Sequence, residues 1–229
     1  MDPKAIVSYD DTDNDRDALM LGRVLAEAGA RLTLAYVRHA TQAQRDREQH
    51  EEHDAEELLD RGAHLMGDLE LERRVVVSAS TAEGLNWLAE QEQADIIVFG
   101  SEYRTAAGHV SPQHSTQTLL EGGCAAVAIA PAGYSTVHVP HVRAVGVLAA
   151  PGDDAAIETA QELAERLGAR VTRDERQVDL LVVGSRSEAP EGRVMITSAA
   201  QNVIENATFP VLVVARGAAV RFGVPAAIS

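Results

Sequence analysis

Two polar loops of this sequence combine glycines with hydroxyl side chains, a combination suited to holding a phosphate group. The first loop begins with Gly100 and Ser101, contains Gly108, and leads through His114 and Ser115 into a pattern with helical spacing. Glycine lets a backbone approach a phosphate closely, and the free N–H groups at the start of a helix attract anions. These residues are therefore candidates for binding the phosphates of a ligand.

The second loop belongs to an internal repeat. Residues 95–133 align with residues 179–217 without a gap, at a constant offset of 84 residues. Gly184 in the second loop thus corresponds to Gly100, and Ser198 corresponds to His114. A repeat of this length indicates a duplicated structural unit. Gly184 and Ser198 are accordingly candidates for an equivalent site in the second unit.

Each unit has the order strand, loop, helix and strand, and its apolar runs are continuous, as in a parallel sheet covered on both faces. Further strands and amphipathic helices alternate before residue 95, which predicts an α/β fold with a doubly wound parallel sheet of five strands. The expected strands are 5–9, 31–37, 74–77, 95–99 and 125–130, and the expected helices are 15–28, 42–66, a segment carrying Leu85, Leu88 and Ala89, and 115–121.

A shortened second copy follows. A strand is expected at 144–148, and the sequence LGARVT at 167–172 matches AGARLT at 28–33 with an offset of 139. The offsets of 139 and 84 differ by 55 residues, so the second copy lacks the third strand and two helices. A unit this short buries little surface alone, so we expect it to pack against the first copy.

These patterns divide the chain into a complete domain at 1–133, a linker at 134–142, a truncated domain at 143–217 and a tail at 218–229. The two domains are called the first and second copy below. The linker has no helical period. The tail is mildly apolar, which predicts that it docks on a domain or adds an edge strand.

Composition limits the partners of the chain. A net charge of −15 repels phosphate backbones and anionic lipids, so neither nucleic acid nor a membrane is expected as a partner. No apolar run approaches the roughly 18 residues that span a bilayer, and no signal-peptide stretch precedes the first strand. Cys124 is the only cysteine, which excludes an intrachain disulfide. We therefore expect a cytoplasmic protein.

A mononucleotide suits the expected fold. In doubly wound sheets, ligands bind beyond the carboxyl ends of the strands, where the strand order reverses. Asp10 follows the first strand at that edge and suits a ribose hydroxyl, and Val37 ends the second strand. The loop is not a Walker A motif, because Lys4 is the only lysine. It is not a dinucleotide fingerprint either, because the first strand-to-helix turn contains no glycine.

Over nearly its full length the chain resembles a tandem universal stress protein. Nucleotide-binding members of that family carry G-x2-G-x9-G-[ST] after the fourth strand. At this spacing the sequence has Gly100, Tyr103, Gln113 and His114, with Ser115 next. The resemblance implies the strand order 3-2-1-4-5, a role in stress response, ATP or another adenine nucleotide as ligand, and an internal pseudo-dimer or a homodimer.

The sequence departs from the family motif. Gln113 and His114 place side chains where the motif brings backbone to the phosphate. The second copy has Gly184, Ser187, Thr197 and Ser198 at the motif positions, and Ala149 or Ala150 in place of Asp10. We therefore predict a non-enzymatic regulatory protein with a degenerate nucleotide site, which acts through an unidentified protein partner or small ligand.

Two alternatives stay open. One is an ATP-binding sensor or slow ATP hydrolase that uses Asp10, Val37, Gly100 and Ser115. The other is a structural homo-oligomer built through the final strands of the copies.

Other residue patterns carry less chemistry. The acids Asp11, Asp13 and Asp15 lack the glycine and glutamate of a calcium loop, so we interpret them as the acidic start of a helix. The segment 50–54, HEEHD, could offer metal ligands, but it lies on the polar face of an acidic helix. We expect no metal site and no catalytic residue, and we expect Cys124 and Trp87 to serve packing.

Overall fold

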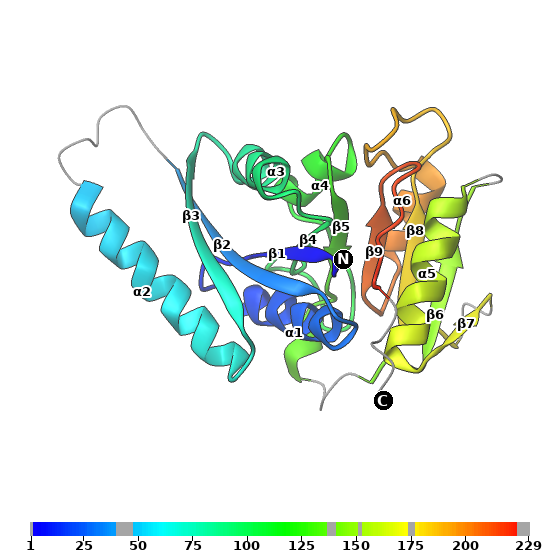
Figure 1. Ribbon diagram of the computed structural model, residues 1–229, viewed down its shortest axis with the longest axis horizontal. Coiled ribbons are helices and arrows are strands. Elements are labelled where there is room, and N and C mark those ends of the chain that lie inside the picture. Colours follow the sequence, from blue (N-terminus) through cyan, green and yellow to red (C-terminus); the bar gives the residue numbers. More distant parts are fainter. Residues whose placement is uncertain (1, 40–47, 137–140, 151–152, 174–176, 224–229) are drawn as a thin grey trace.

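The computed structural model describes residues 2–39, 48–136, 141–150, 153–173 and 177–223, with the backbone only for 48–52. The strands in these ranges form one nine-stranded sheet in the order β3-β2-β1-β4-β5-β9-β8-β6-β7 (Figure 1). The strands are β1 (Lys4–Ser8), β2 (Arg31–His39), β3 (Leu71–Ser78), β4 (Ile96–Phe99), β5 (Ala126–Ile129), β6 (Ala144–Leu148), β7 (Arg170–Thr172), β8 (Leu180–Gly184) and β9 (Val211–Val214). The helices are α1 (Asp13–Glu27), α2 (Glu48–Met66), α3 (Thr81–Glu92), α4 (His114–Leu120), α5 (Asp154–Leu167) and α6 (Ser198–Glu205), with a 3-10 turn η2 (Tyr134–Thr136).

The first copy has the predicted doubly wound fold. Its five strands are parallel and follow the order 3-2-1-4-5. Helices α1 and α2 cover one face, and α3 and α4 cover the other (Figure 1). Strand β4 is buried along its whole length, which is why its sequence is continuously apolar. Among the described helices, none is both long and apolar enough to cross a bilayer.

Two element boundaries differ from the prediction. Strand β3 covers Leu71–Ser78 instead of 74–77, because it pairs with β2 along its full length. It is an edge strand, and its charged residues Glu72 and Arg73 are tolerated where one side faces solvent. Helix α2 is described from Glu48, and the predicted helical residues 42–47 lie outside the described residues.

The second copy repeats part of this arrangement. Strands β7, β6, β8 and β9 are parallel and stand in the order of β2, β1, β4 and β5. Helices α5 and α6 occupy the places of α1 and α4 in the chain order. No counterpart of α2, β3 or α3 occurs in the described part of the segment between β7 and β8, as the repeat offsets predict.

The two copies join edge to edge through one antiparallel strand pair. In this pair, Ala128 of β5 lies opposite Leu212 of β9, and the offset of 84 makes these two residues equivalent positions of the repeat. The loops reciprocate: the Val110 N–H donates to the Ala207 carbonyl at 3.0 Å, and the Val194 N–H donates to the Gly123 carbonyl at 2.9 Å. Equivalent groups thus exchange equivalent hydrogen bonds, which is the pattern of a pseudo-twofold axis.

This pairing corrects one expectation. Strand β5 lies between β4 and β9, and β9 lies between β5 and β8. Both final strands therefore have a neighbour on each side within the chain, so a homo-oligomer cannot form by pairing their edges. The described strands of both copies form a single sheet, with β3 and β7 at its edges.

The hydrophobic core extends through both copies on each face of the sheet. One cluster joins Leu25 of α1 to Leu163 of α5, and the other joins Leu119 of α4 to Ile204 of α6. All four side chains are at most 3% exposed. Burial of this kind stabilises each side chain by about 1.5–3 kcal/mol, and here it is shared between the copies.

The linker and the tail are both anchored. Asp17 of α1 accepts hydrogen bonds at 2.7 Å from the N–H groups of Gly133 and Ser135, which fixes the chain as it leaves the first copy. In the tail, Phe222 is fully buried, and Arg221 forms ion pairs with Glu158 and Glu162 of α5. Residues 218–223 dock on α5, as predicted, and form no strand.

The shared core leads to a stability prediction. A fragment of residues 141–229 will lack cooperative unfolding, because β9 loses its neighbour β5 and both shared clusters are cut. A fragment of residues 1–136 retains its own five strands and will unfold cooperatively, at reduced stability. Thermal denaturation followed by circular dichroism measures both. A cooperative transition in the fragment 141–229 would contradict the shared core.

Candidate functional site

The predicted site lies at the carboxyl ends of the first-copy strands. Strands β1 and β4 are parallel neighbours, so Asp10 after β1 and Gly100 after β4 lie at the same end of the sheet, where these strands end. Asp10 is exposed there. Val37 in β2 is 6% exposed, and its side chain packs toward Gly84 of α3, so only its backbone could face a ligand.

Gly100 is required by the close approach of α1. A Cβ atom at this position would lie 2.1 Å from the carbonyl oxygen of Asn14. The Asn14 side chain also donates from Nδ2 to the Ser101 carbonyl at 2.7 Å. The start of α1 therefore packs directly on the loop that was predicted to receive a phosphate.

Ser101 closes the loop from inside. Its hydroxyl is fully buried, donates to the Ala130 carbonyl at 2.7 Å and accepts from the Ser111 N–H at 3.2 Å. Its counterpart Ser185 makes the same pair of bonds in the second copy, at 2.8 Å and 3.1 Å. Loop closure thus accounts for both repeated serines.

Gly108 forms the sharp turn of the same loop. Its φ is +81°, a conformation that strongly favours glycine, and its N–H donates to the Ala132 carbonyl at 2.7 Å. Gly192 repeats the turn with a φ of +72° and a bond to the Arg216 carbonyl at 2.8 Å. These glycines shape the loop, and the N–H of each is already engaged.

The end of the loop is occupied by a side chain of the protein itself. Gln113 precedes α4, and its amide Nε2 donates toward the carbonyls of Gly100 and Ser101, at 3.4 Å and 3.3 Å. His114 is exposed as the first residue of α4, and Ser115 is half-buried beside it. Glycine at position 113 would leave this space open, and glutamine fills it.

Asp15 is a buried acid that the prediction placed at a helix start without giving it a local role. Its Oδ2 accepts hydrogen bonds at 2.9 Å from the N–H groups of Asp10 and Thr12 and from the Thr12 hydroxyl. Asp13 and Asp15 lie in the first turn of α1, as interpreted, whereas Asp11 lies in the turn before it. Burial, followed by a hydrogen bond with the Asp10 carboxyl, raises the pKa of Asp15 to about 8.

Asp11 is held by two neighbours. It has a φ of 65°, accepts from the Tyr9 hydroxyl at 2.8 Å and forms an ion pair with Arg61 at 2.9 Å. The hydrogen bond from Tyr9, with further help from Arg61, lowers the pKa of Asp11. The turn between β1 and α1 is therefore fixed by the protein's own contacts.

The second copy has a different arrangement at the same place. Asp153 stands where Asn14 stands in the first copy, and a Cβ at Gly184 would lie 1.8 Å from its Oδ2. That oxygen is buried and has no hydrogen-bond partner among the described residues. Burial raises the pKa of Asp153. A cavity of about 690 Å³ opens beside it, lined also by Glu191 and Arg216.

Ser198 does not reach into a closed site. It is exposed as the first residue of α6, where the preceding Thr197 caps the helix by accepting from the Ala200 N–H at 3.1 Å. Gly184 and Ser198 therefore lie at the ends of their loop, as predicted, but Asp153 fills the space between the loop and α5.

The remaining candidates show little chemistry. His53 pairs with Glu57 on an exposed helix surface, and side chains 50–52 lie outside the described residues. No group of three metal-ligating side chains gathers within the described ranges. Burial raises the pKa of Cys124, which lowers its reactivity. The prediction that Trp87 serves packing is wrong: the side chain is 54% exposed, because the inward face of α3 carries Leu85 and Leu88.

The fold and this loop define a doubly wound α/β protein that is duplicated within one chain. The family model described as the universal stress protein family matches residues 3–127 and 172–215, which is more than half of the chain. The chain therefore belongs to the universal stress protein family.

Solved structures agree with this fold. A universal stress protein from Archaeoglobus fulgidus DSM 4304 aligns with a TM-score of 0.71 at 15% identity, over 93% of this chain and 98% of that one. A putative universal stress protein from Pseudomonas aeruginosa UCBPP-PA14 aligns with a TM-score of 0.62 at 13% identity, over 92% of both chains. Among curated proteins, none matches the chain.

The raised pKa of Asp15 gives a direct test of the site's electrostatics. The carboxyl of Asp15 will titrate near pH 8, as followed by carbon-13 NMR. In an Asp10→Asn variant the midpoint will fall but stay above the ordinary value of 3.8, because burial is the larger cause. The exposed first-turn acid Asp13 supplies the control Asp13→Asn, which will leave the midpoint unchanged.

The same shift affects stability in a defined direction. The folded chain holds the Asp15 proton more tightly than the unfolded chain. The resulting contribution to the free energy of unfolding is therefore complete below the unfolded pKa near 3.8. It is lost as the pH rises to about 8. A wild-type midpoint near 3.8 would contradict both statements.

Proposed function

We propose that this chain is a non-enzymatic stress-response protein whose first-copy loop is a degenerate nucleotide site. The observation that carries the proposal is the Gln113 amide on the carbonyls of Gly100 and Ser101. Together with the Asn14 amide on the Ser101 carbonyl, it fills the space beside the loop with polar groups of the protein. A phosphate would have to displace both side chains before it reached the backbone.

The charges of the chain support the same proposal. The net charge of −15 disfavours a triphosphate. The only lysine, Lys4, begins β1 and therefore lies at the opposite end of the strands from the loop. It donates from Nζ to the Glu92 carbonyl at 2.6 Å. Asp10 adds an exposed acidic group beside the loop. No lysine therefore compensates phosphate charge there.

In this proposal the protein acts through contacts rather than catalysis. The two copies form an internal pseudo-dimer that presents both loops on one rigid sheet, and the chain regulates a protein partner or responds to a small ligand in the cytoplasm. The domain limits 1–133 and 143–217 and the linker 134–142 remain part of the proposal. No metal and no catalytic residue are assigned.

One observation favours a second candidate function. The Asp10 side chain is exposed at the end of β1, beside the strand that leads into the Gly100 loop. This is where a ribose hydroxyl would be bound in an ATP sensor or slow ATP hydrolase that also used Val37 and Ser115. The same experiment distinguishes the two candidates.

Calorimetric titration with ATP and Mg²⁺ tests the degenerate site. The wild type will bind with a dissociation constant weaker than about 1 mM. The double variant Gln113→Gly/His114→Ser removes the obstructing amide and restores the glycine–hydroxyl pair, so it will bind about tenfold more tightly, or by about 1.4 kcal/mol.

Wild-type binding tighter than about 1 mM that is lost in Asp10→Ala would instead establish the ATP-binding alternative. Asp68→Ala is the matched control, because Asp68 is an exposed acid in the turn between α2 and β3. Equal losses in both variants would point to net charge rather than to a site.

A further inference from the structure

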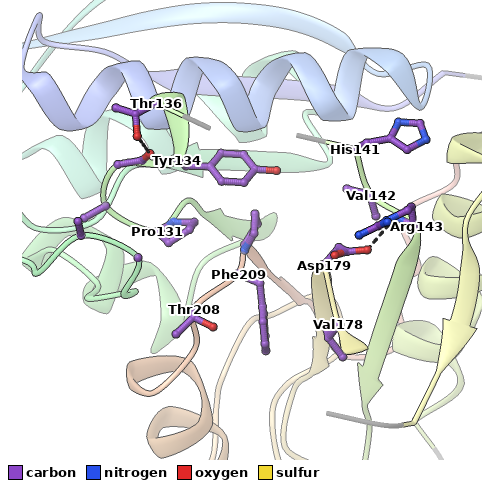
Figure 2. Close-up of a pocket in the computed structure, with 15 residues that line it drawn as sticks. Pro131, Tyr134, Thr136, His141, Val142, Arg143, Val178, Asp179, Thr208 and Phe209 are labelled. Carbon is purple, nitrogen blue, oxygen red and sulfur yellow. Dashed lines mark hydrogen bonds between the residues drawn. The ribbon is translucent and has the colours of Figure 1, made fainter. Parts of the chain in front are cut away.

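A second cavity lies at the seam between the copies, next to Ala107 and Gly108 of the first-copy loop. Its volume is about 740 Å³, which is in the range of small-molecule sites. Pro131 lines it from the first copy and Tyr134 from the start of the linker, and Arg143, Asp179 and Phe209 line it from the second copy (Figure 2).

The antiparallel pairing of β5 and β9 explains this position. The carboxyl end of β5 lies beside the amino end of β9, so the chain after β5 faces the chain before β9. Arg143 and Asp179 stand just before β6 and β8, which also begin at this end of the sheet. The cavity therefore exists only because both copies are present.

Aromatic residues distinguish this end of the seam from its pseudo-symmetric counterpart. At the offset of 84, Tyr134 corresponds to Ala218 and Phe209 corresponds to Ala125. Aromatic residues make up only 3% of the chain, yet two of them line this one cavity. The repeat does not require them, so this end of the seam differs from its counterpart in shape and in polar groups.

The two charged side chains of the cavity, Asp179 and Arg143, differ in whether they have hydrogen-bond partners within the protein. The Asp179 carboxylate accepts from the backbone N–H groups of Arg143 and Ala144, at 2.9 Å and 3.0 Å. The Arg143 side chain extends above Asp179 toward the cavity (Figure 2), and its guanidinium has no hydrogen-bond or ion-pair partner among the described residues. The acid is thus satisfied, and the guanidinium is available to a ligand.

Tyr134 supplies a second unsatisfied donor. The residue is only 8% exposed, and its hydroxyl has no hydrogen-bond partner among the described residues. Burial, with the charges of Asp179 and Glu27, raises the pKa of Tyr134, so the hydroxyl keeps its proton and can donate. A buried hydroxyl without a partner costs roughly 1–3 kcal/mol, which a ligand acceptor would recover.

We propose that this cavity binds a small organic carboxylate with a flat apolar body. The carboxylate accepts from the Arg143 guanidinium and the Tyr134 hydroxyl, and the apolar body lies against the Pro131 and Tyr134 rings, which line the cavity (Figure 2). Ala107 and Gly108 of the Gly100 loop also line the cavity, but Arg143 and Tyr134, which recognise the carboxylate, lie outside that loop, so the site does not depend on the proposed function.

Phenylacetate, phenylacetamide and phenethylamine test the charge requirement with one apolar body. We expect the full-length chain to bind phenylacetate more tightly than about 1 mM by calorimetry, and the neutral amide and the cationic amine at least about tenfold more weakly. Equal binding of the three would show an apolar pocket without carboxylate recognition, and preference for the amine would assign recognition to Asp179. Either result would overturn the proposal, as would the absence of phenylacetate binding.

Two variants locate the site. Arg143→Gln keeps the backbone bond to Asp179 and removes the charge, and Tyr134→Phe removes only the hydroxyl. Each will weaken phenylacetate binding about tenfold, while Arg23→Gln, which removes an exposed arginine of α1 outside the cavity, will leave it unchanged. Thermal denaturation of each variant confirms that it is folded. Unchanged binding in a folded Arg143→Gln or Tyr134→Phe variant would contradict the assignment.

Discussion

The antiparallel pairing of β5 with β9 is the constraint on which the rest of this structure depends. Because Ala128 and Leu212 are equivalent positions of the repeat and lie opposite each other, the pair behaves like the centre of a twofold dimer. The reciprocal bonds of Val110 and Val194 extend that relation to the loops. One chain thereby contains both partners of an interface that two chains would otherwise form.

The pairing also decides where ligands can be bound. Strands of the two copies run in opposite directions, so the carboxyl ends of the first copy face one end of the sheet and those of the second copy face the other. The contacts of Asn14 and Gln113 with the Gly100 loop are made within the first copy, although the same loop also bonds to the second copy through Val110. The seam is different, because there the end of one copy meets the beginning of the other, and residues such as Tyr134 and Arg143 meet across it.

The shortened second copy follows from the same constraint. A unit with four strands and two helices would leave much apolar surface exposed if it stood alone. Here β9 gains a neighbour in β5, and both core clusters continue from one copy into the other. The loss of a third strand leaves the short strand β7 as the sheet edge, with Val171 43% exposed.

The ungapped repeat and the apolar periodicity predicted the parallel strands and the missing segment. The strand order was predicted only through the resemblance to the universal stress protein family. The sequence could not predict the pairing of β5 with β9, because the apolar sequence of a buried strand does not specify which strand lies next to it. The contacts of the candidate loop could not be predicted: the Ser101 hydroxyl donates to the Ala130 carbonyl and closes the loop, and the Gln113 amide donates to the Gly100 carbonyl. The seam cavity was missed because Tyr134, Arg143 and Phe209 are brought together only by the fold.

Hydrogen exchange of the native protein, followed by mass spectrometry, tests the central pairing most directly. If β5 and β9 join the copies into one cooperative sheet, peptides covering 126–129 and 211–214 will exchange together, and as slowly as the peptide covering 96–99 of β4. Exchange of 211–214 well before 126–129 would show that the second copy opens separately, and it would contradict the account.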